Sequence, residues 1–151
     1  METTARSSLW TTADKLIGSP NIVSPIFDLA IRIWVANVFF KSGLVKIQSW
    51  ESTMMLFEYE YSVPILPFDI AAYLATATEL TIPVLLVLGL GSRLSALVLF
   101  VLNYVAVISY PDISAAGIKD HLLWGALLAM TFFHGPGKLS IDHWLKKRLS
   151  G

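Results

Sequence analysis

Five polar side chains of this sequence stand inside or next to long apolar segments, where they could do chemistry: Arg32, Lys46, Glu79, Asn103 and His121. Glu79 is the one acidic residue within the apolar runs 70–88 and 94–110. A carboxylate is costly in lipid, so we expect Glu79 to face protein or trapped water, and a residue of this kind is a functional candidate by default. Together the five groups offer hydrogen-bond donors and a route for protons inside an apolar cleft.

The two apolar runs on either side of residues 89–93 predict a transmembrane hairpin. Each run is about long enough to cross a bilayer at a helical rise of about 1.5 Å per residue. Hydrophobic residues make up 55% of the chain and charged residues 15%, which is more apolar surface than a water-soluble domain of this size needs. A formal net charge of zero argues against nucleic-acid binding. The chain has no cysteine, which excludes disulfides and iron–sulfur clusters bound by its own thiolates.

Two further segments extend the hairpin to a predicted all-α fold, a polytopic membrane protein with a bundle of four transmembrane helices. Residues 26–47 are apolar but carry several charges, and these charges need partners inside the bundle. Asp28 and Arg32 are one turn apart and are expected to pair. Arg32 and Lys46 fall on nearly the same helical face, with small residues between them that let another helix approach. Residues 117–134 form the last segment, which is near the lower length limit for spanning.

Residues 48–68 predict a short interfacial helix that caps one mouth of the bundle. Pro64 and Pro67 end any helix there. An apolar and aromatic stripe at helical spacing is more often packing or headgroup contact than a cofactor site. Residues 9–17 show similar spacing and predict either a helix on the membrane surface or a frayed tail. The stripe in the connector consists of Trp50, Met54, Phe57 and Tyr61.

Inside the bundle, Asn103 and Glu79 reach similar depth from opposite ends of the hairpin, so a hydrogen bond between them is geometrically available. Pro83 frees the backbone carbonyl of Glu79 for water or a ligand. His121 is predicted to be a hydrogen-bonded interface residue, because metal ligands come in sets. A membrane haem would need histidines at matching depth on different helices. We therefore expect no bound metal or haem.

The distribution of lysine and arginine predicts that both termini are cytoplasmic. The connectors on the far side are rich in Asp and Glu. We divide the chain into a cytoplasmic N-terminal tail (1–25), a transmembrane domain (26–134) and a basic amphipathic tail (135–151), in which Ser140 is predicted to cap a helical turn over 141–149. The basic residues on the predicted cytoplasmic side are Arg6, Lys15, Arg93, Lys138, Lys146, Lys147 and Arg148.

Several short motifs stand in a characteristic order: Arg32, Phe40-Lys-Ser-Gly-Leu-Val-Lys46, Glu79, Gly89-Leu-Gly-Ser-Arg93 and Gly135-Pro-Gly-Lys-Leu-Ser-Ile-Asp142. In this order and spacing, over about residues 27–145, the chain resembles the DoxX family of small four-helix membrane proteins of bacteria and archaea. The resemblance implies a location in the plasma (inner) membrane. The family takes its name from a membrane subunit linked to thiosulfate:quinone oxidoreductase, and no catalytic set carries over from it.

Three functional hypotheses follow. The first is a membrane subunit or anchor of a redox assembly that binds a quinone-like molecule among Arg32, Lys46, Glu79, Asn103 and His121, with the chain at most one subunit of an oxidoreductase. The second is a small ion-coupled transporter in which Glu79 binds a proton or cation. The third is a scaffold for a partner protein, with purely structural polar residues. All three place the chain in contact with the lipid bilayer and with a protein partner or a second copy of itself.

Overall fold

The computed structural model describes residues 20–150, with side chains from Ser24 onward, and within that range the chain forms six helices and no strand. The prediction of an all-α fold is thus confirmed for this part of the chain. The surface helix predicted at 9–17 lies outside the described residues. The helices are α2 (Pro20–Gln48), α3 (Trp50–Tyr59), α4 (Phe68–Leu88), α5 (Ser92–Ser109), α6 (Ala115–His134) and α7 (Ile141–Leu149).

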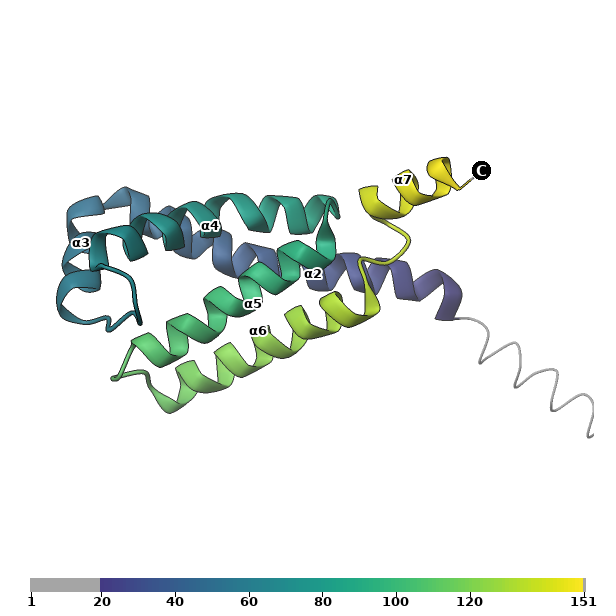
Figure 1. Cartoon of the computed structure of the whole chain (residues 1–151). Coiled ribbons are helices and arrows are strands. Elements are labelled where there is room, and N and C mark those ends of the chain that lie inside the picture. Colours follow the sequence, from purple (N-terminus) through teal and green to yellow (C-terminus); the bar gives the residue numbers. More distant parts are fainter. Residues whose placement is uncertain (1–19, 151) are drawn as a thin grey trace, which may run out of the picture.

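The four long helices are arranged as two pairs. Helix α2 packs most extensively against α4, and α5 packs most extensively against α6. The pairs meet near the short turn between α4 and α5 and diverge toward α3 (Figure 1). Helix α3 lies at one end of the bundle, whereas α7 lies at the other end, together with the described start of α2 (Figure 1). The fold therefore has an α3 end and an α7 end.

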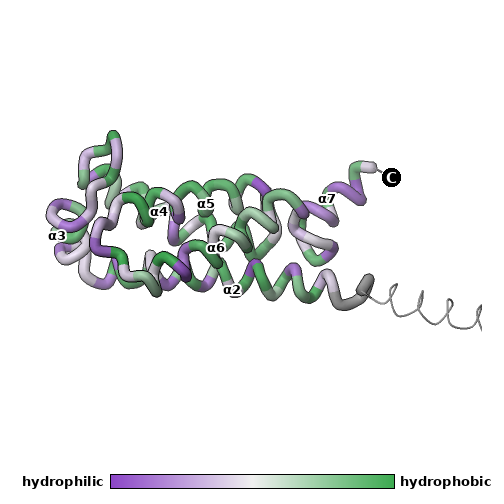
Figure 2. Tube along the Cα trace, turned by 90° about the horizontal axis from the view of Figure 1, so that it is seen from below, coloured by the Kyte–Doolittle hydropathy of each residue, from purple (hydrophilic) through white to green (hydrophobic). Residues whose placement is uncertain are grey.

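Two of these helices, α4 and α5, are long and apolar enough to cross a membrane. They are the two arms of the predicted hairpin. Helix α2 carries charged side chains between Asp28 and Lys46, and α6 begins with a polar run from Lys119 to His121. Hydrophobic residues predominate along the long helices, whereas hydrophilic residues gather on α7 and near α3 (Figure 2).

Helix α2 begins earlier than predicted, at Pro20 rather than near residue 26. Proline suits the first position of a helix, where the backbone N–H has no partner within the helix. Pro25 lies inside α2 without ending it. The last helix begins where predicted, since the Ser140 hydroxyl accepts a hydrogen bond from the His143 N–H at 3.2 Å.

Two clusters of buried side chains hold the helices together. The larger one joins all four long helices and includes Val35, Leu86, Leu99 and Leu128. The smaller one lies at the α3 end, where Phe57 packs with two alanines of α4, Ala71 and Ala72. The other three members of the predicted stripe, Trp50, Met54 and Tyr61, pack against this second cluster, so the prediction that the stripe serves packing is confirmed.

Candidate functional site

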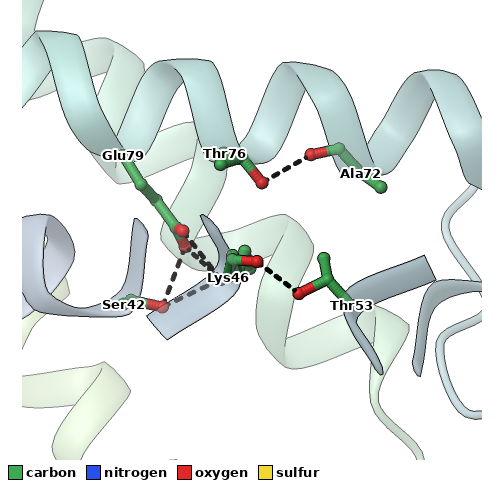
Figure 3. Close-up of polar contacts among 6 residues, drawn as sticks. All are labelled: Ser42, Lys46, Thr53, Ala72, Thr76 and Glu79. Atoms are coloured by element: carbon green, nitrogen blue, oxygen red, sulfur yellow. Dashed lines mark hydrogen bonds and ion pairs between the residues drawn. The ribbon is translucent and has the colours of Figure 1, made fainter. Parts of the chain in front are cut away.

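An ion pair between α2 and α4 is the central polar feature of the bundle. The Lys46 ammonium donates to both carboxylate oxygens of Glu79, at 2.9 Å to Oε1 and 2.7 Å to Oε2 (Figure 3). The Ser42 hydroxyl, one turn before Lys46, donates to Glu79 Oε1 at 3.2 Å and accepts from Lys46 Nζ at 2.9 Å. The side chains of Lys46 and Glu79 are only 17% and 9% exposed. Glu79 thus faces protein, as the cost of a carboxylate in lipid requires.

Close packing of α2 on α4 positions this pair. A side chain at Gly43 would place its Cβ 3.0 Å from the Cβ of Glu79, so glycine is needed for the observed approach of the two helices. Pro83 is buried one turn after Glu79. On the opposite side of the pair, the Thr53 hydroxyl of α3 donates to the Lys46 carbonyl at 2.9 Å (Figure 3). The helix that carries Lys46 is therefore held by two neighbours.

The ion pair lines a cavity of about 650 Å³, which we call the central cavity. It lies among α2, α4, α5 and α6 toward the α3 end, where the helix pairs diverge. Its walls are mainly aliphatic and aromatic. Among the polar side chains that line it are Ser42, Lys46, Tyr61, Glu79, Ser109, Tyr110 and His121.

Two of these polar side chains, Tyr61 and Ser109, have further properties of note. Burial raises the pKa of the Tyr61 phenol above its usual value, as do nearby Tyr110, Glu60 and Glu79, so the hydroxyl stays protonated near neutral pH. Ser109 is 3% exposed, and its buried hydroxyl has no hydrogen-bond partner among the described residues. An unsatisfied buried hydroxyl costs roughly 1–3 kcal/mol. A ligand that hydrogen-bonds to Ser109 would remove this cost.

Asn103 and His121 form a second polar contact, between α5 and α6. The Asn103 amide donates to the His121 backbone carbonyl at 2.9 Å, and its side-chain oxygen lies 2.8 Å from His121 Nδ1. The sequence makes a hydrogen bond from Asn103 to Glu79 possible, because the two residues lie at similar depth. Asn103 instead makes these contacts with His121. Within residues 24–150 no hydrogen bond uses the other ring nitrogen of His121, and the residue lines the central cavity.

Arg32 lies away from the central cavity, toward the α7 end. Its guanidinium donates to the backbone carbonyls of Leu86 at 3.1 Å and Val87 at 2.9 Å, and also to the carbonyl of Leu139. The side chain is 1% exposed. No hydrogen bond or ion pair to Asp28 accompanies these contacts in the described part of the chain, so the expected pairing along α2 is replaced by backbone carbonyls from two other segments.

The Asp142 carboxylate completes this region, which we call the α7 junction and define by Arg32, Ser92 and Asp142. It accepts from the backbone N–H groups of Gly91 and Ser92 and from the Ser92 hydroxyl, each at 2.8 Å. Partial burial works to raise the pKa of Asp142, but the hydrogen bonds from Ser92 and Gly91 outweigh it, and the pKa is lowered. An acidic group at the start of α5 also interacts favourably with the helix dipole.

Glycine at position 89 is required at the α7 junction for two reasons. Its φ of +70° belongs to the left-handed region, which residues other than glycine rarely adopt. An added Cβ would also lie 2.4 Å from the Cβ of Ser140 and 2.7 Å from an Arg32 nitrogen. The Gly89 carbonyl accepts from the Asp142 N–H at 2.9 Å. The turn and the final segment can approach each other only because this residue has no side chain.

The five residues singled out from the sequence thus fall into three groups. Lys46 and Glu79 are paired on the cavity wall, Asn103 holds His121 on the facing helix, and Arg32 belongs to the α7 junction. Sequence reasoning missed Ser42, although its spacing of one turn before Lys46 places both on one face. It also missed Ser109, because a serine at a helix end carries no distinctive signal. Among the described residues, no group of three His, Asp or Glu side chains is arranged to hold a metal ion.

Comparison with known proteins supports the resemblance seen in the motifs. The family model described as DoxX matches residues 27–111. An uncharacterized protein of Haemophilus influenzae is 33% identical over 133 residues, covering 83% of this chain and 87% of the relative. No solved structure matches the chain. By the extent of both matches, the chain belongs to the DoxX family and is a DoxX family membrane protein.

Proposed function

We propose that this protein is a membrane subunit of a redox assembly and that its central cavity binds a quinone-like molecule. The observation that carries the proposal is the Lys46–Glu79 pair on the wall of a mainly apolar cavity. A volume of about 650 Å³ falls within the roughly 300–1,000 Å³ typical of small-molecule sites, which combine apolar walls with a few polar groups.

The polar groups of the cavity match the needs of a quinone headgroup. Its two carbonyl oxygens accept hydrogen bonds, and the cavity offers donors from facing helices: Lys46 on α2, and Ser109 and His121 on α5 and α6. Reduction of a quinone to a quinol takes up two electrons and two protons. In this proposal a partner protein of the assembly supplies the electrons, and the chain has no cysteine to hold an iron–sulfur cluster of its own. The Lys46–Glu79 pair is placed to pass protons.

We further propose that α2 and α6 span the membrane together with α4 and α5, which gives four spans. Both helices expose large apolar side chains that a soluble protein would bury. On α2 these include Ile33 and Trp34, each 47% exposed, and on α6 Leu122 and Phe133, at 68% and 78%. The charged Arg32 and Lys46 of α2 turn inward to protein partners, which removes the main objection to its insertion.

The orientation we propose places the α7 end in the cytoplasm and the protein in the inner membrane. Basic residues gather at this end, including Arg93, Lys138 and Lys146, and lysine and arginine favour the cytoplasmic side. Both termini would then be cytoplasmic. The acidic residues near α3, such as Glu58 and Glu60, would lie on the opposite side.

Quinone binding can be measured with the purified full-length chain in lipid nanodiscs, by titrating ubiquinone-1 and following tryptophan fluorescence, since Trp124 lines the cavity. We expect saturable quenching, with binding roughly tenfold weaker in Glu79→Gln, as the loss of about 1.4 kcal/mol would give. The matched control is Glu58→Gln, which changes an exposed carboxylate on α3. No saturable quenching in the native chain, or equal affinity in Glu79→Gln, would overturn the proposal.

A second variant separates ligand contact from folding. Ser109→Ala removes a buried hydroxyl that has no partner, so the ligand-free protein should be as stable as the native chain or more stable. Binding of ubiquinone-1 should nonetheless weaken, by a few-fold. Unchanged binding would show that Ser109 does not contact the ligand.

The same ion pair argues against the transporter hypothesis. Glu79 already accepts hydrogen bonds from Lys46 and Ser42, so a transported cation would first have to displace the ammonium. Proton-coupled uptake into vesicles under a pH gradient, lost in Glu79→Gln, would reverse this preference. The scaffold hypothesis differs in requiring no ligand at all, and it would be favoured by a co-purified partner together with no quinone binding.

A further inference from the structure

A second cavity, of about 590 Å³, lies at the α7 end. It is formed by the start of α5, the end of α6, the loop that follows, α7 and the beginning of α2. We call it the basic cavity, because five side chains that carry or can take up positive charge line it: Arg93, His134, Lys138, His143 and Lys146. It lies at the opposite end of the long helices from α3 (Figure 1) and shares no lining residue with the central cavity.

Two carboxylates, Asp28 and Asp142, face the same space and offset two of its three permanent cations, Arg93, Lys138 and Lys146. Both oxygens of Asp142 accept hydrogen bonds from Gly91 and Ser92. Asp28 lies beside the loop, since a Cβ added at Gly137 would fall 2.5 Å from its Oδ2. Among residues 24–150 the structure contains one ion pair, Lys46–Glu79, so none of the three cations makes an ion pair with a carboxylate within that range. The cavity therefore keeps a net positive charge that could attract an anion.

The surroundings of the basic cavity are those of a membrane surface. Helix α7 is strongly amphipathic and carries three basic residues in its last turn. Its apolar side chains remain exposed, with Trp144 at 54% and Leu149 at 87%, and Arg148 stacks on the Trp144 ring at 4.6 Å. Helices with an apolar face and a basic face lie in the headgroup region of a bilayer. Leu94, which lines the cavity, is itself 67% exposed.

We propose that the basic cavity is a binding site for the phosphate group of an anionic lipid. Arg93 provides a planar donor suited to two phosphate oxygens, and Lys138 and Lys146 add charge from the loop and from α7. The exposed apolar side chains beside the cavity would contact the acyl chains of the same lipid. Juxtamembrane lysines and arginines attract anionic headgroups in this way. The inference goes beyond the proposed quinone site and does not depend on it.

The test uses the full-length chain in mild detergent, with phosphatidylglycerol as the probe and phosphatidylcholine and inorganic phosphate as comparisons. Native mass spectrometry should detect one retained phosphatidylglycerol, and thermal unfolding should shift upward with this lipid but not with phosphatidylcholine. The triple variant Arg93→Gln/Lys138→Gln/Lys146→Gln should bind it at least roughly tenfold more weakly. These side chains are exposed and make no hydrogen bond within the described residues, so the variant should fold without lipid.

The matched control is Lys41→Gln/Lys119→Gln/Lys147→Gln, which removes the same charge from exposed positions outside the basic cavity. It should retain the lipid. An equal loss of phosphatidylglycerol binding in both triple variants would mean that net charge attracts the lipid nonspecifically, and it would overturn the proposed site. If inorganic phosphate raised the unfolding temperature as much as phosphatidylglycerol does, the ligand would be a free anion and the lipid assignment would be overturned. Binding of ubiquinone-1 should be unchanged in the cavity variant, so failure of this inference and failure of the quinone proposal are distinguishable.

Discussion

Arg32 is a buried cation and Lys46 a half-buried one on the same helix, and their hydrogen-bond partners differ in kind. Arg32 donates to three backbone carbonyls from two distant segments, and none of its hydrogen bonds goes to a carboxylate. Lys46 is paired with the Glu79 carboxylate and shares it with Ser42. The first arrangement joins three parts of the chain at the α7 junction. The second leaves a charged, exchangeable pair on the wall of a cavity.

This difference separates a structural cation from a functional candidate. The guanidinium has several fixed donors, and backbone carbonyls do not titrate. An ammonium and a carboxylate can each exchange a proton or a partner. Both regions contain residues from the motifs on which the resemblance to the DoxX family rests, so membership in such a motif does not by itself mark a ligand site.

The largest expected effect comes from breaking the Lys46–Glu79 pair on one side only. Lys46→Met leaves a buried carboxylate without its partner, and removal of one member of a buried pair costs about 3–5 kcal/mol. The double variant Lys46→Met/Glu79→Leu should recover most of this loss, because no unpaired charge remains. Unfolding in detergent, followed by circular dichroism for Lys46→Met, Glu79→Leu and the double variant, measures the coupling. Additive losses in the double variant would show that the pair is not energetically coupled.

Arg32→Met should destabilise the protein by a smaller amount, about 3 kcal/mol. Each hydrogen bond to a charged group contributes roughly 1.5–3 kcal/mol, but the substitution also removes the cost of burying the cation, and Met keeps the apolar stem. Arg32→Lys should fall in between, since an ammonium cannot reproduce the planar set of donors. The affinity for ubiquinone-1 should not change in the folded fraction. A loss of ubiquinone-1 binding with unchanged stability would place Arg32 in the ligand site, and Arg32 and Lys46 would then no longer differ in role.

The smallest effect is expected at Asp142. Replacing it with Asn should cost about 1 kcal/mol, as for a lost helix cap, and should speed tryptic cleavage within α7, which follows undocking of that helix. Asp120→Asn, at an exposed carboxylate on α6, is the control. Because the pKa of Asp142 is lowered from 3.8, its contribution is fully present above about pH 4 and is lost as the pH falls through the depressed value. Cleavage by an acid protease should therefore rise only in that low range, and an earlier rise would contradict the assignment.

The sequence predicted the elements better than it predicted their partners. The apolar runs located α4 and α5, and the cost of a carboxylate in lipid placed Glu79 against protein. The similar depth of Asn103 and Glu79 along their helices suggested a hydrogen bond between them, but Asn103 turns toward α6. Depth alone does not determine in which direction about the helix axis a side chain points. The partners of Arg32 could not be predicted, because they are backbone carbonyls, which every residue carries whatever its side chain.

The contacts of Arg32 also set an order of assembly. Its acceptor at Leu139 lies 107 residues further along the chain, so α2 emerges from the ribosome long before the guanidinium can complete its hydrogen bonds. Until the chain end is synthesised, the inserting helices carry a cation that is only partly satisfied. The segment that follows α6 thus supplies the last hydrogen-bond partner of Arg32, and a chain truncated before Leu139 would enter the membrane without this contact.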